Sequence, residues 1–188
     1  MFSDKFLDGC VAVKSGDITR ENVDVIVNAA NSTLLGGGGV DGAIHDAGGA
    51  SILEECREIR RVKYPNGLPT GEVVITSGGN LPARFVIHTV GPIYGAKEAE
   101  APEKLLANCY KNSLSLVVEN NLKSVAFPSI STGAFGYPKP EAARVSSTAI
   151  KEFLEQEKTL EQILLIFFSD ADARLFLKHQ QFESTADV

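Results

Sequence analysis

Short apolar runs rich in β-branched residues alternate along this chain with longer segments of helical periodicity. Such alternation is typical of an α/β layered fold, in which strands and helices follow one another. The runs that predict strands are residues 10–14, 25–29, 72–76, 85–89, 124–127 and 162–168. The segments that predict helices are residues 40–47, 51–62, 102–120, 140–155 and 171–179.

Two apolar runs, residues 25–27 and 163–168, would bury both faces of their strands. Strands of this kind are typical of a sheet that helices cover on both sides, so we expect a three-layer α/β/α sandwich. The length of 188 residues, without a linker or a repeat, indicates a single domain. We expect this domain to span residues 1–181, and residues 182–188 to form a flexible C-terminal tail.

Composition and charge exclude several classes of function. The longest apolar run, residues 163–168, is far shorter than the roughly 20 residues of a membrane span. The net charge of −6 repels nucleic acid and anionic membranes, so we expect neither as a partner. The three cysteines are widely separated and lack metal-ligand spacing, which favours reduced thiols in the cytoplasm over disulfides or a zinc site. A bound anion would need local donors, such as backbone N–H groups and helix N-termini.

Asn28 and Asn31 stand at the end of the strand predicted at residues 25–29. Asparagine is depleted in strands, so this pair calls for an explanation. In open α/β sheets, ligands bind at the carboxyl ends of the strands, where a carboxamide offers both a donor and an acceptor to sugar hydroxyls. Alternatively, both side chains tie the turn together through hydrogen bonds to the backbone.

Four consecutive glycines, at positions 36–39, precede the first predicted helix. Such a run indicates unusual backbone dihedrals or the close approach of another group. Glycines 37, 39 and 42 satisfy the dinucleotide-binding pattern G-x-G-x-x-G. However, no strand leads directly into them, and no acid ends a second strand about 20 residues later. The sequence therefore disfavours classical NAD binding, and it contains no P-loop.

A second loop with glycines, residues 128–138, connects a predicted strand to the helix predicted at residues 140–155. Both glycine loops precede helix N-termini, which can direct several N–H groups at an anion. Neither loop contains Lys or Arg, so an anion held between them would be bound mainly by the main chain. Phe135 would then be free to cover a sugar face. The alternative is a merely flexible connection.

Asp17 lies just past the first predicted strand. Its carboxylate could cap the following turn by bonding Thr19, which the spacing alone favours, or accept a hydrogen bond from the exocyclic amine of a purine. His88 follows alternating apolar residues, and we interpret it as a buried structural histidine.

Five segments, taken together, resemble the macro domain family and specifically its MacroD-type branch. They are residues 16–19, 25–31, 35–45, 87–92 and 129–138. The resemblance extends from about residue 10 to residue 180, in order and at the family's spacing. It implies a mixed, roughly six-stranded sheet between helices and a deep cleft for ADP-ribose, with no cofactor and no metal.

The resemblance assigns a part of ADP-ribose to each segment. Asp17 matches the acid that bonds the adenine amine, with the Ile18 backbone beside it, and Phe168 matches the residue that packs on adenine. Residues of the two glycine loops match the walls that hold the pyrophosphate and distal ribose: Gly36, Gly37, Gly38, Gly39, Val40, Ser131, Thr132, Gly133, Ala134, Phe135 and Gly136. We also expect Asn28 and His45 to take part in substrate binding.

Members of this branch remove ADP-ribose from acidic side chains and deacetylate O-acetyl-ADP-ribose. The implied partners are therefore ADP-ribose, its esters and mono-ADP-ribosylated proteins. The residues implicated in the chemistry match Asn31 and Asp41. Asp41 could orient or deprotonate a water molecule while Asn31 fixes the ribose.

Several alternatives stay open at this point. An isolated Asp at a helix start is usually a structural N-cap, which is the other interpretation of Asp41. His45, one helical turn later, could pair with Asp41 or support the loop. The domain could also bind ADP-ribose without turnover, or act as a phosphatase on ADP-ribose 1″-phosphate.

Overall fold

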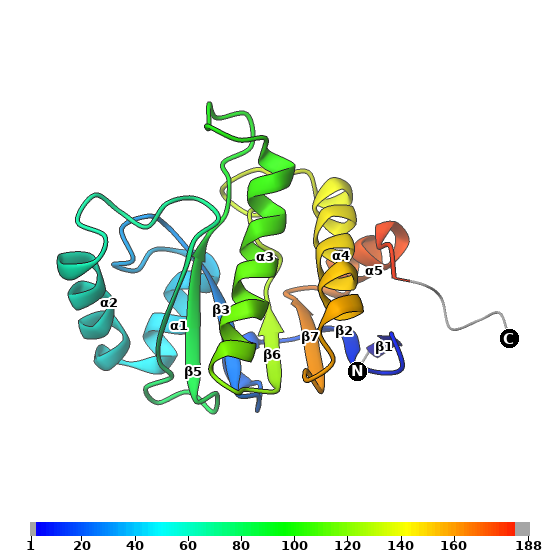
Figure 1. Ribbon diagram of the computed structural model, residues 1–188, viewed down its shortest axis with the longest axis horizontal. Helices are drawn as coiled ribbons and strands as arrows, with labels where there is room; N and C mark the ends of the chain where they lie inside the picture. The colour runs from blue at the N-terminus through cyan, green and yellow to red at the C-terminus, as the bar shows by residue number, and fades with distance from the viewer. Residues whose placement is uncertain (1–2, 183–188) are drawn as a thin grey trace, which may run out of the picture.

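The computed structural model describes residues 3–182, in which a seven-stranded sheet lies between two layers of helices (Figure 1). The strands follow the order β1-β2-β7-β6-β3-β5-β4. Their bounds are β1 Ser3–Phe6, β2 Val11–Ser15, β3 Val25–Ala30, β4 Val73–Ser77, β5 Phe85–Val90, β6 Ser124–Phe127 and β7 Gln162–Phe167. The helices are the 3-10 turn η1 Ile18–Arg20, α1 Gly39–Gly48, α2 Ala50–Val62, α3 Pro102–Glu119, α4 Lys139–Gln156 and α5 Asp170–His179. The predicted three-layer α/β/α sandwich is confirmed.

The sheet has one strand more than the roughly six expected. The additional strand, β1, pairs antiparallel with β2 at the edge of the sheet. Its sequence, Ser-Asp-Lys-Phe, contains a single apolar residue, Phe6, which is buried. An edge strand needs little apolar surface, so no apolar run marks this one in the sequence.

Five strands, β2, β7, β6, β3 and β5, run parallel, whereas β1 and β4 are antiparallel to their neighbours. Parallel strands end at the same edge of a sheet. The segments that follow β2, β3, β6 and β7 therefore meet at this edge, although they are far apart in the sequence.

The helices divide into two layers. Figure 1 shows α3 and α4 in front of the sheet and α1 behind it, and the buried apolar residues form two clusters, one for each face. The cluster under α3, α4 and α5 contains the larger aromatic side chains, such as Phe127 and Tyr137. The other cluster packs α1 and α2 against the sheet through Ile44, Ile52 and Cys56. No helix within residues 3–182 is long and apolar enough to cross a membrane.

Phe182, the first residue of the predicted tail, packs into the core. It is 4% exposed, and its ring centroid lies 5.3 Å from that of Phe6. Packing against the domain therefore extends one residue past the predicted boundary. The other residues of that prediction, 183–188, lie outside the part of the chain that the structure describes.

Candidate functional site

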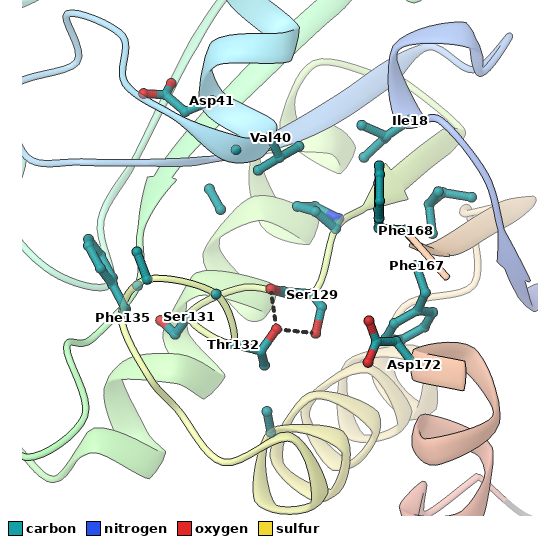
Figure 2. Close-up of a pocket in the computed structure, with 18 of the residues that line it drawn as sticks. Ile18, Val40, Asp41, Ser129, Ser131, Thr132, Phe135, Phe167, Phe168 and Asp172 are labelled. Atoms are coloured by element: carbon teal, nitrogen blue, oxygen red, sulfur yellow. Dashed lines mark hydrogen bonds between the residues drawn. The ribbon is translucent and has the colours of Figure 1, made fainter. Parts of the chain in front are cut away.

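A cavity of about 950 Å³ opens at the edge of the sheet where the parallel strands end (Figure 2). The segments that follow β2, β3 and β6, the end of β7, and the first turns of α1, α4 and α5 line it. Ligands of open α/β sheets bind at such an edge. The cavity is large enough for a dinucleotide-sized ligand.

Most of the predicted site residues line this cavity. They are Asp17, Ile18, Asn31, Gly37, Gly38, Gly39, Val40, Asp41, Ser131, Thr132, Gly133, Ala134, Phe135 and Phe168. Two aromatic side chains mark its extent: Figure 2 shows Phe135 on the same side as Asp41, and Phe168 on the opposite side beside Ile18.

Four predicted residues, Asn28, Gly36, His45 and Gly136, lie outside the cavity lining. Asn28 is completely buried and its side chain donates to Asp41, whereas His45 lies one helical turn beyond Asp41. The Gly36 carbonyl accepts a hydrogen bond from Asn31, and the Gly136 N–H closes a turn. All four therefore support residues of the lining instead of forming the lining themselves.

Asp17 caps the turn that follows β2. Its Oδ1 accepts from the Thr19 N–H at 3.0 Å and from the Thr19 hydroxyl at 2.6 Å, which confirms the capping interpretation. The bond from the Thr19 hydroxyl is the main cause that lowers the pKa of Asp17. The side chain is 52% exposed and lines the cavity, so the cap leaves part of the carboxylate available to a ligand.

The glycine loop ends at α1, whose first residues line the cavity and carry N–H groups without partners inside the helix. Gly38 is the N-cap and makes no side-chain cap, so these N–H groups are open to an anion. A Cβ on Gly37 would lie 2.9 Å from Asp41 Oδ2 and 3.1 Å from Asn31 Nδ2. The absence of a side chain at Gly37 therefore allows the Asp41 carboxylate and the Asn31 amide to approach the same point of the wall.

The second loop is held in shape by its own hydrogen bonds. Thr132 donates to the Ser129 carbonyl at 3.0 Å and lies 2.8 Å from the Ser129 hydroxyl (Figure 2, dashed). The Ser131 carbonyl accepts from the Tyr137 N–H at 2.9 Å, with Ser131 in the left-handed region at φ 65°. The Phe135 carbonyl accepts from the Tyr94 N–H at 2.9 Å. These bonds argue against a merely flexible connection.

Asn31 lines the cavity and also ties its own turn together. Its Oδ1 accepts from the Thr33 N–H at 3.0 Å and from the Thr33 hydroxyl, while its Nδ2 donates to the Gly36 carbonyl at 3.0 Å. The turn-forming interpretation of Asn31 is therefore confirmed, and the same bonds orient the amide at the cavity. One N–H of Nδ2 is left for a ligand.

Asp41 is not the N-cap of α1, so that interpretation is wrong. Gly38 occupies the N-cap, and Asp41 lies in the first turn with 4% of its surface exposed. Its Oδ1 accepts from Asn28 Nδ2 at 2.7 Å and lies 3.5 Å from His45 Nε2. Asp41 Oδ2 faces Gly37, at the cavity.

Asn28 links Asp41 to His88, which is fully buried as predicted. Asn28 Nδ2 lies 3.1 Å from His88 Nδ1, and His88 Nε2 lies 3.0 Å from the Thr76 hydroxyl. Burial, together with the nearby His45, lowers the pKa of His88 to about 3. His88 is therefore neutral at physiological pH.

His45, Cys56 and His88 form the one group that could hold a metal ion within residues 3–182, with donor atoms within 4.8 Å of one another. Both ring nitrogens of His88 already have hydrogen-bond partners, Asn28 and Thr76. Burial raises the pKa of the Cys56 thiol to about 12, and the neutral thiol is a poor metal ligand. These features favour a hydrogen-bonded cluster over a metal centre.

Sequence reasoning missed the charged pair on the far side of the cavity. Lys139, the first residue of α4, pairs at 2.5 Å with Asp172 in the first turn of α5, and both line the cavity. The bond from Lys139 is the main cause that lowers the pKa of Asp172. A signal existed, because Lys139 directly follows the second glycine loop and Asp172 follows the end of β7, but their pairing depends on tertiary packing.

Comparisons with known proteins found relatives in sequence and in fold. A family model for the macro domain matches residues 27–146. The O-acetyl-ADP-ribose deacetylase of Citrobacter koseri is 50% identical, over 88% of this chain and 92% of that protein. The ADP-ribose glycohydrolase MACROD2 of Xenopus laevis is 47% identical, over 88% of this chain and 38% of that protein. The Oceanobacillus iheyensis macrodomain solved with ADP superposes with a TM-score of 0.89 at 47% identity, covering 95% of this chain and 93% of its own. A mutant of that macrodomain, solved with ADPR, superposes with a TM-score of 0.88.

Proposed function

This chain belongs to the macro domain family, and on that premise we propose that it binds ADP-ribose and hydrolyses esters of the distal ribose. Two reactions follow: removal of ADP-ribose from modified acidic side chains and deacetylation of O-acetyl-ADP-ribose. They are one reaction with different acyl groups, because each breaks an ester bond with water.

The bound ligand extends from one aromatic residue to the other. Adenine lies between Ile18 and Phe168, with its amine donating to Asp17. The pyrophosphate lies between the N-terminus of α1 and residues 131–136, where backbone N–H groups bind it. This arrangement suits a protein of net charge −6, since its anion site does not depend on a positive field.

The observation that carries the hydrolase proposal is the approach of Asn31 Nδ2 and Asp41 Oδ2 to Gly37. It supports a site where one group holds a ribose hydroxyl and the other orients a water molecule. Asp41 accepts a proton from the water as the water oxygen attacks the ester carbonyl, and it returns this proton to the ribose oxygen as the bond between that oxygen and the carbonyl carbon breaks. The products are free ADP-ribose and a carboxylic acid, with no covalent intermediate.

We propose that the reaction requires no metal and takes place in the cytoplasm. The full hydrogen bonding of His88, with its neighbour Cys56 held as a thiol, supports metal independence. Three free cysteines, Cys10, Cys56 and Cys109, support a reducing compartment. The protein substrates are mono-ADP-ribosylated at Glu or Asp. The net charge of −6 disfavours nucleic acid as a partner.

A time course of ADP-ribose release from a glutamate-linked mono-ADP-ribosylated protein tests the function. The reaction contains a chelator, and Asn31→Ala serves as the matched variant. We expect release by the native chain and little release by the variant. Activity that depends on added metal would contradict metal independence alone.

Two further assays separate the alternatives. ADP-ribose binding without any release would identify a binding module. Faster phosphate release from ADP-ribose 1″-phosphate than ester hydrolysis would identify a phosphatase. Either outcome would contradict the hydrolase proposal while leaving the site itself in place.

A further inference from the structure

We propose that His88 and Thr76, which lie outside the cavity, position the Asp41 carboxylate by fixing the amide of Asn28. The inference rests on the proposed function, because it treats Asp41 as the group that orients water. It adds two positioning residues, His88 and Thr76, that do not line the cavity.

The sheet brings these side chains together. Asn28 on β3 pairs in register with His88 on β5, and Thr76 lies two residues along β4 from Val74, the register partner of His88. Residues two apart on a strand share a face, so Thr76 lies beside the His88 ring. The exposed fractions of Asn28, Thr76 and His88 are 0%, 3% and 0%. Water therefore cannot replace a lost hydrogen-bond partner among these three side chains.

In the hydrogen-bonded series Asp41–Asn28–His88–Thr76, the donors and acceptors at both ends favour the same direction, and Cys56 Sγ, 3.8 Å from His88 Nε2, can accept weakly in that direction. At one end, Asp41 Oδ1 can only accept, so the Asn28 amide must present its NH₂ group, at 2.7 Å. The second N–H of that group points at His88 Nδ1, 3.1 Å away, which must therefore be the unprotonated nitrogen.

The hydrogen bonds of Thr76, at the other end of this series, favour the same direction. The Thr76 hydroxyl donates to the Ser77 carbonyl at 3.0 Å, because a carbonyl can only accept. Its oxygen then accepts from His88 Nε2 at 3.0 Å, which places the ring proton on Nε2. Both ends thus select the same tautomer of His88. The low pKa of His88, about 3, keeps the ring neutral, so Nδ1 stays free to accept.

Loss of the Thr76 acceptor would weaken this selection, because only the Asn28 end would still favour it and the one remaining partner of His88 Nε2 would be the weakly accepting Cys56 Sγ, 3.8 Å away. With the proton on Nδ1, His88 would require an acceptor from Asn28, and the amide would turn its oxygen toward the ring. Asn28 Oδ1, which has no partner in the observed arrangement, would gain one, while Asp41 Oδ1 would lose its donor. The carboxylate would then rotate away from the water position.

The primary test compares Thr76→Val with Thr76→Ser. Valine keeps the shape of the side chain without the hydroxyl, whereas serine keeps the hydroxyl. We expect Thr76→Val to lower kcat about tenfold, because the charge-assisted hydrogen bond from Asn28 to Asp41 would be lost. KM and the Kd of ADP-ribose should change less than about twofold. Thr76→Ser should stay within about threefold of the native kcat. Thermal unfolding of each variant checks that the compared proteins are folded.

A second pair tests His88 directly. The amide oxygen of His88→Asn can occupy the Nδ1 position and accept from Asn28, whereas His88→Leu offers no acceptor. We expect His88→Asn to retain more of the native kcat than His88→Leu at equal folded fraction. Equal loss in both variants would overturn the inference, because a purely structural role does not depend on the acceptor.

Nitrogen NMR of the His88 ring provides a readout that does not need activity. The native chain should show protonated Nε2 and bare Nδ1, and Thr76→Val should show a changed tautomer ratio. Protonated Nδ1 in the native chain would overturn the inference, as would an unchanged kcat in Thr76→Val. A native chain that releases no ADP-ribose would instead contradict the proposed function, and the ring spectrum would still decide whether Thr76 sets the tautomer.

Discussion

The two ends of the cavity are built in different ways. At one end Asp17 is 52% exposed and Phe168 is 98% exposed, and the contacts of Asp17 are local. At the other end Asp41 is 4% exposed, and it is hydrogen-bonded to buried Asn28, which in turn contacts buried His88. An exposed group can supply affinity at little cost to the fold, whereas a group that orients water must be held in one geometry. Changes at the exposed end should therefore alter binding, and changes at the buried end should alter turnover and stability.

The largest expected effect is that of Asp41→Ala on turnover. Removal of a group that accepts a proton in the transition state should lower kcat by about 10² to 10⁴-fold. ADP-ribose should still bind, and calorimetry alongside the ester assay measures both. Asp41→Asn keeps the size of the side chain, so a similar loss in that variant would assign the effect to the charge. Native turnover in Asp41→Ala would remove Asp41 from the mechanism.

Gly37→Ala should give the next largest effect. The added Cβ would lie 2.9 Å from Asp41 Oδ2 and 3.1 Å from Asn31 Nδ2, so both side chains must shift. We expect kcat to fall about tenfold, since small misplacements of catalytic groups are costly. The matched variant is Gly38→Ala, because a Cβ there meets nothing within 4 Å and would face the pyrophosphate. Its effect should fall on KM, and a kcat loss as large as in Gly37→Ala would contradict the comparison.

The buried end should also make stability depend on pH. The pKa of His88 is lowered from 6.5 to about 3, so the unfolded chain binds the proton more tightly. Stability is then complete above about pH 6.5 and is lost as the pH falls toward 3, by about 1.4 kcal/mol per pH unit. Urea unfolding between pH 7.5 and 4.5 measures this slope, and His88→Asn should reduce it by that amount. An identical slope in the two proteins would show that His88 titrates normally in the folded state.

Much of the fold could be predicted from the sequence, because its strands and helices carry their own periodicity. The exception was β1, where one apolar residue in four leaves no pattern. The glycine loops also predicted the edge at which the cavity opens. Their composition is local, and parallel strands bring the segments after them to one edge by topology alone.

The roles of individual polar residues were harder to predict. Asn28 was expected at the ligand, but alternation along β3 directs its side chain to Asp41 and away from the cavity. Asp41 stands where the sequence suggests an N-cap, yet Gly38 occupies the N-cap, and the Asp41 carboxylate accepts a hydrogen bond from Asn28 instead. The pair of Lys139 and Asp172 depends on how α4 meets α5. Each of these placements depends on packing between elements distant in sequence, which local patterns do not encode.

The smallest effect is expected at the exposed end, in Asp17→Asn. Asparagine can still cap η1 by accepting from the Thr19 N–H, but it lacks the charge that strengthens a bond from the adenine amine. Because the side chain is half exposed, water screens this bond, and we expect the Kd of ADP-ribose to rise about three- to tenfold with kcat nearly unchanged. Asp17→Ala removes the cap as well, so a larger loss of affinity there would measure what the ordered turn contributes. A fall in kcat for Asp17→Asn, without a change in Kd, would mean that the two ends of the cavity do not divide binding from chemistry.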